Sequence, residues 1–194
     1  MMRFTDRSRT ETDWRCPRRR YWNYEYAGTG IEPLEQNFDL VFGLAVHEGL
    51  AVLARTNDVE SAVNVLTATD RVGWTPAWDA LAEGMIHGFA RHIWPSLRES
   101  ADLLLPEKEL TQLLDPALTY MARPDLIIRD KISSEYWKVA YKTTGYQDTK
   151  WLASWSNAPQ LQANIAMIEQ VMGIAVAGVR VIGLYKGRKD YQTG

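Results

Sequence analysis

The chain has 194 residues, one cysteine and a formal net charge of −2. A chain of this length buries about 70% of its unfolded surface, which suits one hydrophobic core and is too little for two comfortable domains. Hydrophobic residues make up 46% of the chain and charged residues 24%, so overall disorder is excluded. We therefore expect a single domain over residues 1–194, with residues 1–12 flexible.

Cysteine content and hydropathy exclude several classes of protein. The single cysteine, Cys16, excludes an internal disulfide, a four-cysteine zinc site and a self-contained four-cysteine iron–sulfur cluster. A reducing, cytoplasmic setting is the expected one. No apolar run approaches the roughly 20 residues that a membrane span needs. The start of the chain is polar, so neither a membrane anchor nor a secretory signal is expected.

Residues 13–26 (DWRCPRRRYWNYEY) mix basic and aromatic side chains and are expected to form a short helix or turn at the surface. Arginines suit phosphate contacts, and neighbouring aromatic rings suit stacking on bases. The alternative is a solvated helix face with apolar packing beneath it. The candidate nucleic-acid-binding residues are Arg15, Arg18, Arg19 and Arg20, at least one of which is expected to make a phosphate contact.

Three helices are predicted in the first half of the chain. Residues 38–54 place four residues, His47 among them, on one face at helical spacing. Residues 58–67 form a second, short helix. The third covers residues 75–93, since a Thr-Pro pair begins it and Pro95 stops it.

The second half of the chain has the pattern of a sheet. Three consecutive strands are predicted at residues 105–114, 117–129 and 135–144, with turn signals between them. A helix over residues 159–172 follows, with proline at its start and glycine just past its end. Residues 175–187 form one more strand. This order predicts an α/β or α+β domain with a small mixed sheet flanked by helices.

The hairpin between the second and third of these strands juxtaposes two polar residues. A symmetric hairpin about a turn at residues 130–135 pairs Asp125 with position 140, with β-carbons about 5 Å apart. Lys142 points to the same face as position 140, because side chains alternate along a strand. A second carboxylate at position 140 would complete a site for a divalent cation and metal-assisted hydrolysis. Position 140 is Ala, so this carboxylate is missing.

Five segments in chain order resemble the PD-(D/E)XK nucleases, in the RecB-like branch that includes phage exonucleases and CRISPR-associated nucleases. The core of that family, an Asp-bearing strand followed by Asp or Glu, any residue and Lys, is similar to ARPDLII and VAYKTTG. The N-terminal Cys-Pro-basic-aromatic segment of the branch resembles CPRRRYW. Its helix with a metal-binding His resembles FGLAVHEGL, and its Gln-containing helix resembles PQLQANIAMIEQVMG.

This resemblance implies a restriction-endonuclease-like core and hydrolysis of DNA phosphodiester bonds with Mg²⁺ or Mn²⁺, at linear ends or on single strands. It assigns His47 and Asp125 to the metal, with the backbone carbonyl of Tyr141 as a further ligand. Lys142 matches the catalytic lysine, and Gln160 matches the helix glutamine near the site. Some members carry an iron–sulfur cluster on four cysteines, so no cluster is expected here.

Ala140 is the main departure from the family, because it occupies the second acidic position of the catalytic and metal-binding set. Asn164 and Ala122 stand where Tyr and Gly are common. With Ala140 the chain is expected to be nearly inactive, either as an engineered form of an exonuclease or as a natural pseudonuclease. In the second reading it is a non-catalytic subunit that binds DNA ends in a recombination or CRISPR-adaptation complex. A homo-oligomer and a recombinase partner remain open.

Three further titratable residues are weighed against the same site. Glu109 lies on the strand before Asp125 and either reaches the site or pairs with a base such as Arg123. His87 and His92 are five positions apart in a predicted helix, do not share a face well, and are expected to be structural.

Overall fold

A computed structural model describes residues 3–31, 37–68, 74–145, 148–156 and 158–187. Its helices are α1 (Arg7–Arg15), α2 (Pro17–Tyr24), the 3₁₀ turn η1 (Tyr26–Gly28), α3 (Phe38–Thr56), α4 (Val59–Ala68), α5 (Pro76–His92), α6 (Trp94–Ser100), α7 (Thr149–Ala153) and α8 (Pro159–Met172). Its strands are β1 (Arg3–Thr5), β2 (Ala101–Pro106), β3 (Leu110–Asp115), β4 (Leu118–Ala122), β5 (Leu126–Asp130), β6 (Tyr136–Thr144) and β7 (Val176–Tyr185).

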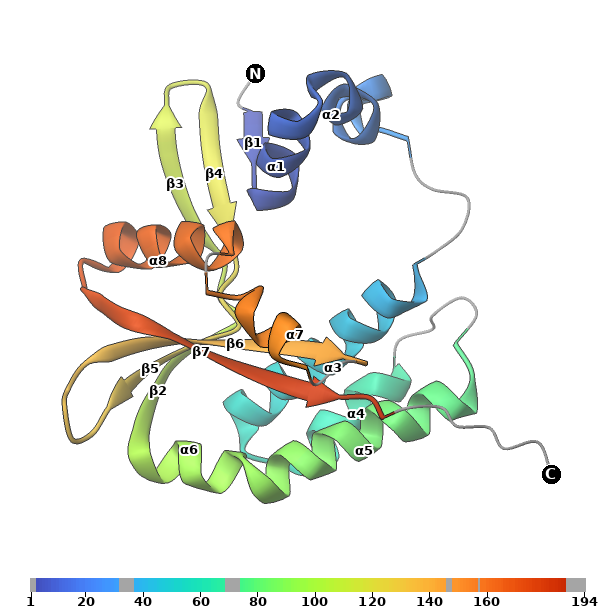
Figure 1. Ribbon diagram of the computed structural model, residues 1–194, viewed down its shortest axis with the longest axis vertical. Helices are drawn as coiled ribbons and strands as arrows, with labels where there is room; N and C mark the ends of the chain where they lie inside the picture. The colour runs from blue at the N-terminus through green and yellow to red at the C-terminus, as the bar shows by residue number, and fades with distance from the viewer. Residues whose placement is uncertain (1–2, 32–36, 69–73, 146–147, 157, 188–194) are drawn as a thin grey trace.

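Two mixed sheets organise the molecule (Figure 1). The larger has the order β2-β5-β6-β7, in which β6 and β7 are parallel and the other neighbours are antiparallel. The smaller has the order β1-β4-β3, in which β1 runs parallel to β4. The predicted mixed α/β architecture is confirmed, with two sheets in place of the single sheet that was expected.

One bent antiparallel ribbon joins the two sheets. β2 leads into β3 and β4 leads into β5, while β2 pairs with β5 and β3 pairs with β4. Both chains of the ribbon bend at the same place, at residues 107–109 on one side and 123–125 on the other, and Figure 1 shows β3 and β4 turned away from the larger sheet. The predicted strands at 105–114 and 117–129 are therefore wrong in one respect, because each is divided at this bend. Pro124 lies in the second break, where its missing N–H interrupts strand pairing.

The predicted hairpin register is confirmed. Leu126 pairs with Val139, and Arg129 pairs with Tyr136, around the turn that begins at Asp130. One step further along the same register, Asp125 lies opposite Ala140. This register brings the Asp of the first motif beside the lysine-bearing strand of the second.

The N-terminal segment contains regular secondary structure. Residues 3–5 form β1 on the edge of the smaller sheet, and α1 begins at residue 7. The flexibility of residues 1–12 stays a prediction. Residues 1–2 lie outside the described residues. Residues 13–26 are helical and exposed, as predicted. The sequence signal for β1 was missed because three residues are too few for a strand pattern.

Helices cover both faces of the larger sheet. Helices α3, α4 and α5 form one core with β5 and β6, centred on fully buried Phe42, Leu50 and Ile86. Helix α8 covers the opposite face, where Ile168 packs near Ile127. No helix in the described part of the chain has both the length and the apolar character that a membrane crossing needs.

Gly49 sets how closely α3 approaches α4 and α5. A β-carbon at this position would lie 2.9 Å from Cδ1 of Ile86 and 3.0 Å from the carbonyl oxygen of Ala62. Gly49 stands two residues after His47 in α3 and so lies on a different side of the helix. The close approach at Gly49 therefore sets the distance of α3 as a whole from α4 and α5.

We expect Gly49→Ala to lower the free energy of unfolding by about 1–3 kcal/mol through overpacking. The matched control is Gly84→Ala in the interior of α5, where a β-carbon would meet nothing within 4 Å. That change is expected to raise stability by about 0.5–1 kcal/mol, because alanine loses less entropy than glycine in a helix. Urea denaturation measures both; equal effects of the two changes would contradict the close packing at Gly49.

Candidate metal centre

Three side chains from distant parts of the chain converge at the bend of the ribbon. His47 comes from α3, Glu107 directly follows β2, and Asp125 directly precedes β5. Nδ1 of His47 lies 3.4 Å from Oε1 of Glu107 and 3.3 Å from Oδ1 of Asp125. One ligand atom from each of the three lies within 4.8 Å of the others. We call His47, Glu107 and Asp125 the candidate metal centre.

The backbone at the bend holds the two carboxylates in place. The N–H of Glu107 donates to the carbonyl of Asp125 at 3.0 Å. Glu107 has φ of 50°, in the left-handed region that non-glycine residues rarely adopt. Such a conformation persists only where its surroundings over-determine it, and it is enriched at functional sites. The Oδ2 atom of Asp125 accepts the backbone N–H of Tyr141 at 2.8 Å, which ties the bend to β6.

The electrostatics of this centre suit a cation. Burial alone would lower the pKa of His47, but hydrogen bonds and charge from Asp125 and Glu107 outweigh burial and raise it to about 9. Burial acts to raise the pKa of Asp125, but His47, Lys142 and Lys138 outweigh it and hold that pKa below its ordinary value. At neutral pH the protonated imidazole therefore neutralises part of the charge of the two carboxylates.

Lys142 stands beside the centre in a fixed position. Its Nζ donates to Oε1 of Gln160 at 3.1 Å and lies 5.1 Å from the ring centroid of Trp155. Burial is the largest influence on the pKa of Lys142 and lowers it, although the Asp125 carboxylate opposes this shift. The predicted juxtaposition of Asp125, Lys142 and Gln160 is confirmed.

A solvent-open hollow of about 730 Å³ contains the centre, and we call it the metal cleft. His47, Glu107, Asp125, Lys142 and Gln160 all line it. The lining also includes three arginines, two acidic residues and two exposed leucines on the His47 face of α3: Arg7, Arg55, Arg123, Asp39, Glu48, Leu40 and Leu44.

Ala140 is fully buried and adds no polar atom to the cleft. Two residues earlier in β6, Lys138 is only 1% exposed, and burial lowers its pKa to about 8 despite the opposing charge of Asp125. Alternation along the strand places Lys138, Ala140 and Lys142 on the same face. Lys138 is thus a second buried amine near Asp125, and it was not predicted from the sequence. The only sign of it was its two-residue spacing from position 140, which continues to Lys142.

Tyr141 contributes packing and a backbone donor. Its ring contacts His47, with ring centroids 6.1 Å apart, and packs edge-on to Phe89. Burial is the main cause that raises the pKa of its phenol, and Asp125 adds to it. The role of its backbone carbonyl as a metal ligand stays a prediction.

The two glutamates before Asp125, Glu107 and Glu109, have different surroundings. Glu107, which the sequence analysis did not assign, reaches the metal centre. Glu109 is exposed and pairs with Arg123 at 3.5 Å, as one of the two alternatives had it. Regular strand alternation would place Glu107 and Glu109 on the same face, so their spacing does not show which of them reaches the centre. The bend at Glu107 interrupts this alternation and separates the two side chains.

The predicted DNA-contacting arginines are exposed or half-exposed on α1 and α2. Arg15 pairs with Glu11 at 2.8 Å, and Arg20 pairs with Glu25 at 3.2 Å. In the part of the chain that the structure describes, Arg18 and Arg19 form no ion pair. Whether any of the four contacts DNA stays a prediction.

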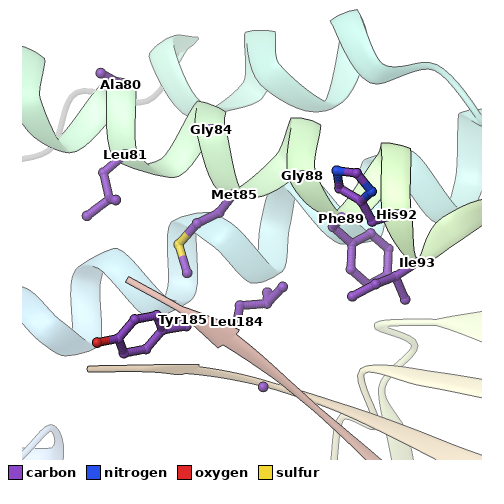
Figure 2. A pocket seen from close by; sticks show the side chains of 11 residues that line it. Ala80, Leu81, Gly84, Met85, Gly88, Phe89, His92, Ile93, Leu184 and Tyr185 are labelled. Atoms are coloured by element: carbon purple, nitrogen blue, oxygen red, sulfur yellow. The ribbon is translucent and has the colours of Figure 1, made fainter. Parts of the chain in front are cut away.

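A second hollow, of about 350 Å³, lies between α5 and β7. Figure 2 shows Met85, Phe89 and Ile93 of this region facing Leu184 and Tyr185. Its lining is almost wholly apolar, with His92 as its one imidazole and no carboxylate or lysine. The partly buried titratable groups His47, Asp125 and Lys142 line the metal cleft and not this hollow. His87 and His92 are exposed on α5, away from the centre.

Comparison with known proteins identifies no relative. No protein-family model matches the chain, and no curated protein matches it. The resemblance to PD-(D/E)XK nucleases therefore stays a prediction from the sequence motifs.

Replacing Glu107 tests its membership of the centre. We expect Glu107→Gln to weaken Mn²⁺ binding by at least about tenfold, in line with the sensitivity of metal sites to their ligand shells. The matched control is Glu109→Gln, two residues away and paired with Arg123, which should bind Mn²⁺ as the unaltered chain does. Calorimetric titration measures both affinities; an equal loss in the two variants would remove Glu107 from the ligand set.

The pKa of His47 predicts a pH dependence of metal affinity. A metal ion needs the neutral imidazole, so binding below about pH 9 must displace one proton. Apparent Mn²⁺ affinity is therefore expected to rise about tenfold from pH 6.5 to pH 7.5, and His47→Gln is expected to abolish this rise. Titrations in buffers of different ionisation enthalpy count the released proton. A flat profile in the unaltered chain would contradict the assignment.

Proposed function

We propose that this protein is a divalent-metal-dependent nuclease that hydrolyses phosphodiester bonds of DNA, from linear ends or on single strands. The observation that carries the proposal is the convergence of His47, Glu107 and Asp125 beside Lys142 in one open cleft. The motif order, which resembles the RecB-like PD-(D/E)XK nucleases, supplies the reaction class. The confirmed hairpin register supports that resemblance, because it brings the two motifs together.

The donor set fits one hard cation. Ligands about 2.1 Å from a Mg²⁺ ion lie about 3 Å apart when they are neighbours in an octahedron. The distances from Nδ1 of His47 to the two carboxylate oxygens, 3.3 Å and 3.4 Å, are close to this value. Two carboxylates favour Mg²⁺ or Mn²⁺, and the imidazole shifts the preference toward Mn²⁺. When bound, such a cation polarises the scissile phosphate and lowers the pKa of an attacking water.

Lys142 is the second functional group of the proposed site. Gln160 and Trp155 both contact its amine. These contacts hold the side chain in one conformation, with its charge facing the cleft. A lysine held in this way orients the attacking water and offsets negative charge that develops on the phosphate in the transition state. The amide of Gln160 acts as the positioning group for this lysine.

Glu107 changes what Ala140 implies. Without Glu107, the chain would offer only His47 and Asp125 as side-chain ligands, and near inactivity would follow. With Glu107 in place, we propose that the chain as given binds the cation and cleaves slowly, while the missing carboxylate at position 140 limits the rate. Lys138 supports a carboxylate at that position, because its buried amine lies on the same strand face and would gain a partner of opposite charge.

The second candidate function is a DNA-end-binding subunit without catalysis, in a recombination or CRISPR-adaptation complex. Ala140 is the observation that favours it. The two functions differ in whether a restored carboxylate yields cleavage.

An assay on end-labelled linear DNA with Mn²⁺ tests the proposal. We expect slow cleavage by the chain as given, at least tenfold faster cleavage by Ala140→Asp, and a loss of about 10²-fold or more when Lys142→Ala is added. Closed circular DNA should resist if the enzyme needs an end. Chelator abolishes cleavage, and Glu109→Gln serves as the matched variant with unchanged cleavage. Intact DNA with both the given chain and Ala140→Asp would reject the nuclease; retention of that DNA in a gel shift would then favour the second function.

A further inference from the structure

A further hollow, of about 200 Å³, lies on α1 and α2 next to the metal cleft, and we call it the arginine groove. Arg7 lines both the arginine groove and the metal cleft. Arg7 also lines a third small hollow together with Arg123 and Gln160. Since Arg7 borders all three hollows, the arginine groove on the N-terminal helices lies beside the metal cleft. The lining residues of the arginine groove are Arg7, Ser8, Glu11, Thr12, Arg15 and Arg19.

The arginine groove carries an excess of positive charge. Three guanidiniums face one carboxylate, that of Glu11, which pairs with Arg7 at 3.0 Å and with Arg15 at 2.8 Å. Glu11 therefore holds these two side chains in place without neutralising both of them. Arg19 is exposed and, within the described residues, forms no ion pair. Ser8 and Thr12 add hydroxyl groups between the arginines.

Arg7 couples the groove to the catalytic lysine. It follows Asp6, which caps α1 by accepting the backbone N–H of Arg9 at 2.9 Å, so the start of α1 is fixed in place. The charge of Arg7 is close enough to lower the pKa of both Lys138 and Lys142, although burial is the larger cause for each. Nε of Arg7 is buried without a hydrogen-bond partner, so this side chain retains an unused donor.

We propose that the arginine groove binds the phosphodiester backbone of a DNA strand whose neighbouring phosphate lies in the metal cleft, with Arg7 contacting the strand where it passes from the cleft to the groove. This inference rests on the proposed function for its ligand. Arginine guanidiniums match phosphate geometry with two donors, and hydroxyls supplement such contacts. The groove assigns Arg15 and Arg19 to DNA, leaves Arg18 outside and leaves Arg20 tied to Asp13 and Glu25.

Binding of a labelled single-stranded oligonucleotide in the presence of chelator tests the groove apart from catalysis. Each lost phosphate contact lowers the slope of log affinity against log salt by about 0.7. We expect Arg19→Gln to lower the slope by about this amount, and Arg15→Gln with Arg19→Gln to lower it by about twice as much, with at least fivefold weaker binding. The matched control is Arg91→Gln on α5, which removes the same charge from an exposed site outside both hollows. Its salt slope should equal that of the unaltered chain.

Cys16, the single cysteine, provides an independent readout, because it is exposed and adjoins Arg15. An oligonucleotide concentration that just saturates the unaltered chain is expected to slow the alkylation of Cys16 by iodoacetamide about fivefold or more. The same concentration should slow it less in Arg15→Gln with Arg19→Gln, because that variant binds less of the oligonucleotide. Unaltered slopes in the groove variants, an equal loss in Arg91→Gln, or no binding by the unaltered chain would each overturn the inference. Groove-dependent binding without cleavage by Ala140→Asp would uphold the groove and reject the nuclease.

Discussion

The hydrogen bond from the N–H of Glu107 to the carbonyl of Asp125 is the constraint on which the candidate site depends. It joins the two chains of the ribbon at the point where both leave the larger sheet. Had the ribbon run straight, side chains would have continued to alternate through Glu107. Strand β2 would then have continued directly into β3, and β4 into β5, within one sheet. The bend instead turns two carboxylates toward α3, where His47 meets both. A strained φ at Glu107 is consistent with a backbone held by its surroundings.

Charge balance explains why so many ionisable groups lie together. Two carboxylates face the imidazole of His47 and the amines of Lys138 and Lys142. Removing one partner from such a cluster leaves an uncompensated buried charge, which costs more than the pair contributes. Under the proposed function, a cation bound at the centre would replace the His47 proton and would supply the positive charge that the carboxylates require.

Much of the fold and part of the site could be predicted from the sequence. The helix that bears His47, the hairpin register and the meeting of Asp125 with Lys142 depend on local periodicity and on one turn, which a sequence displays directly. The place of Gln160 near Lys142 was expected only from the family resemblance. Glu107 could not be assigned to the site, because its position depends on a bend in the ribbon that no sequence pattern predicts. The strand β1 and the place of Arg7, which follows it, could not be predicted either. This three-residue strand pairs with β4, more than a hundred residues later in the sequence. The arginines were recognised by type, but which of them share a groove depends on how α1 meets α2.

The position of a bound ion tests the proposed metal centre without reference to activity. It can be located in a crystal of the protein soaked in Mn²⁺, from an anomalous difference map. We expect one strong peak within about 2.3 Å of Nδ1 of His47 and of a carboxylate oxygen from both Glu107 and Asp125. A peak that leaves Glu107 uncoordinated, or no peak at this bend under saturating Mn²⁺, would contradict it.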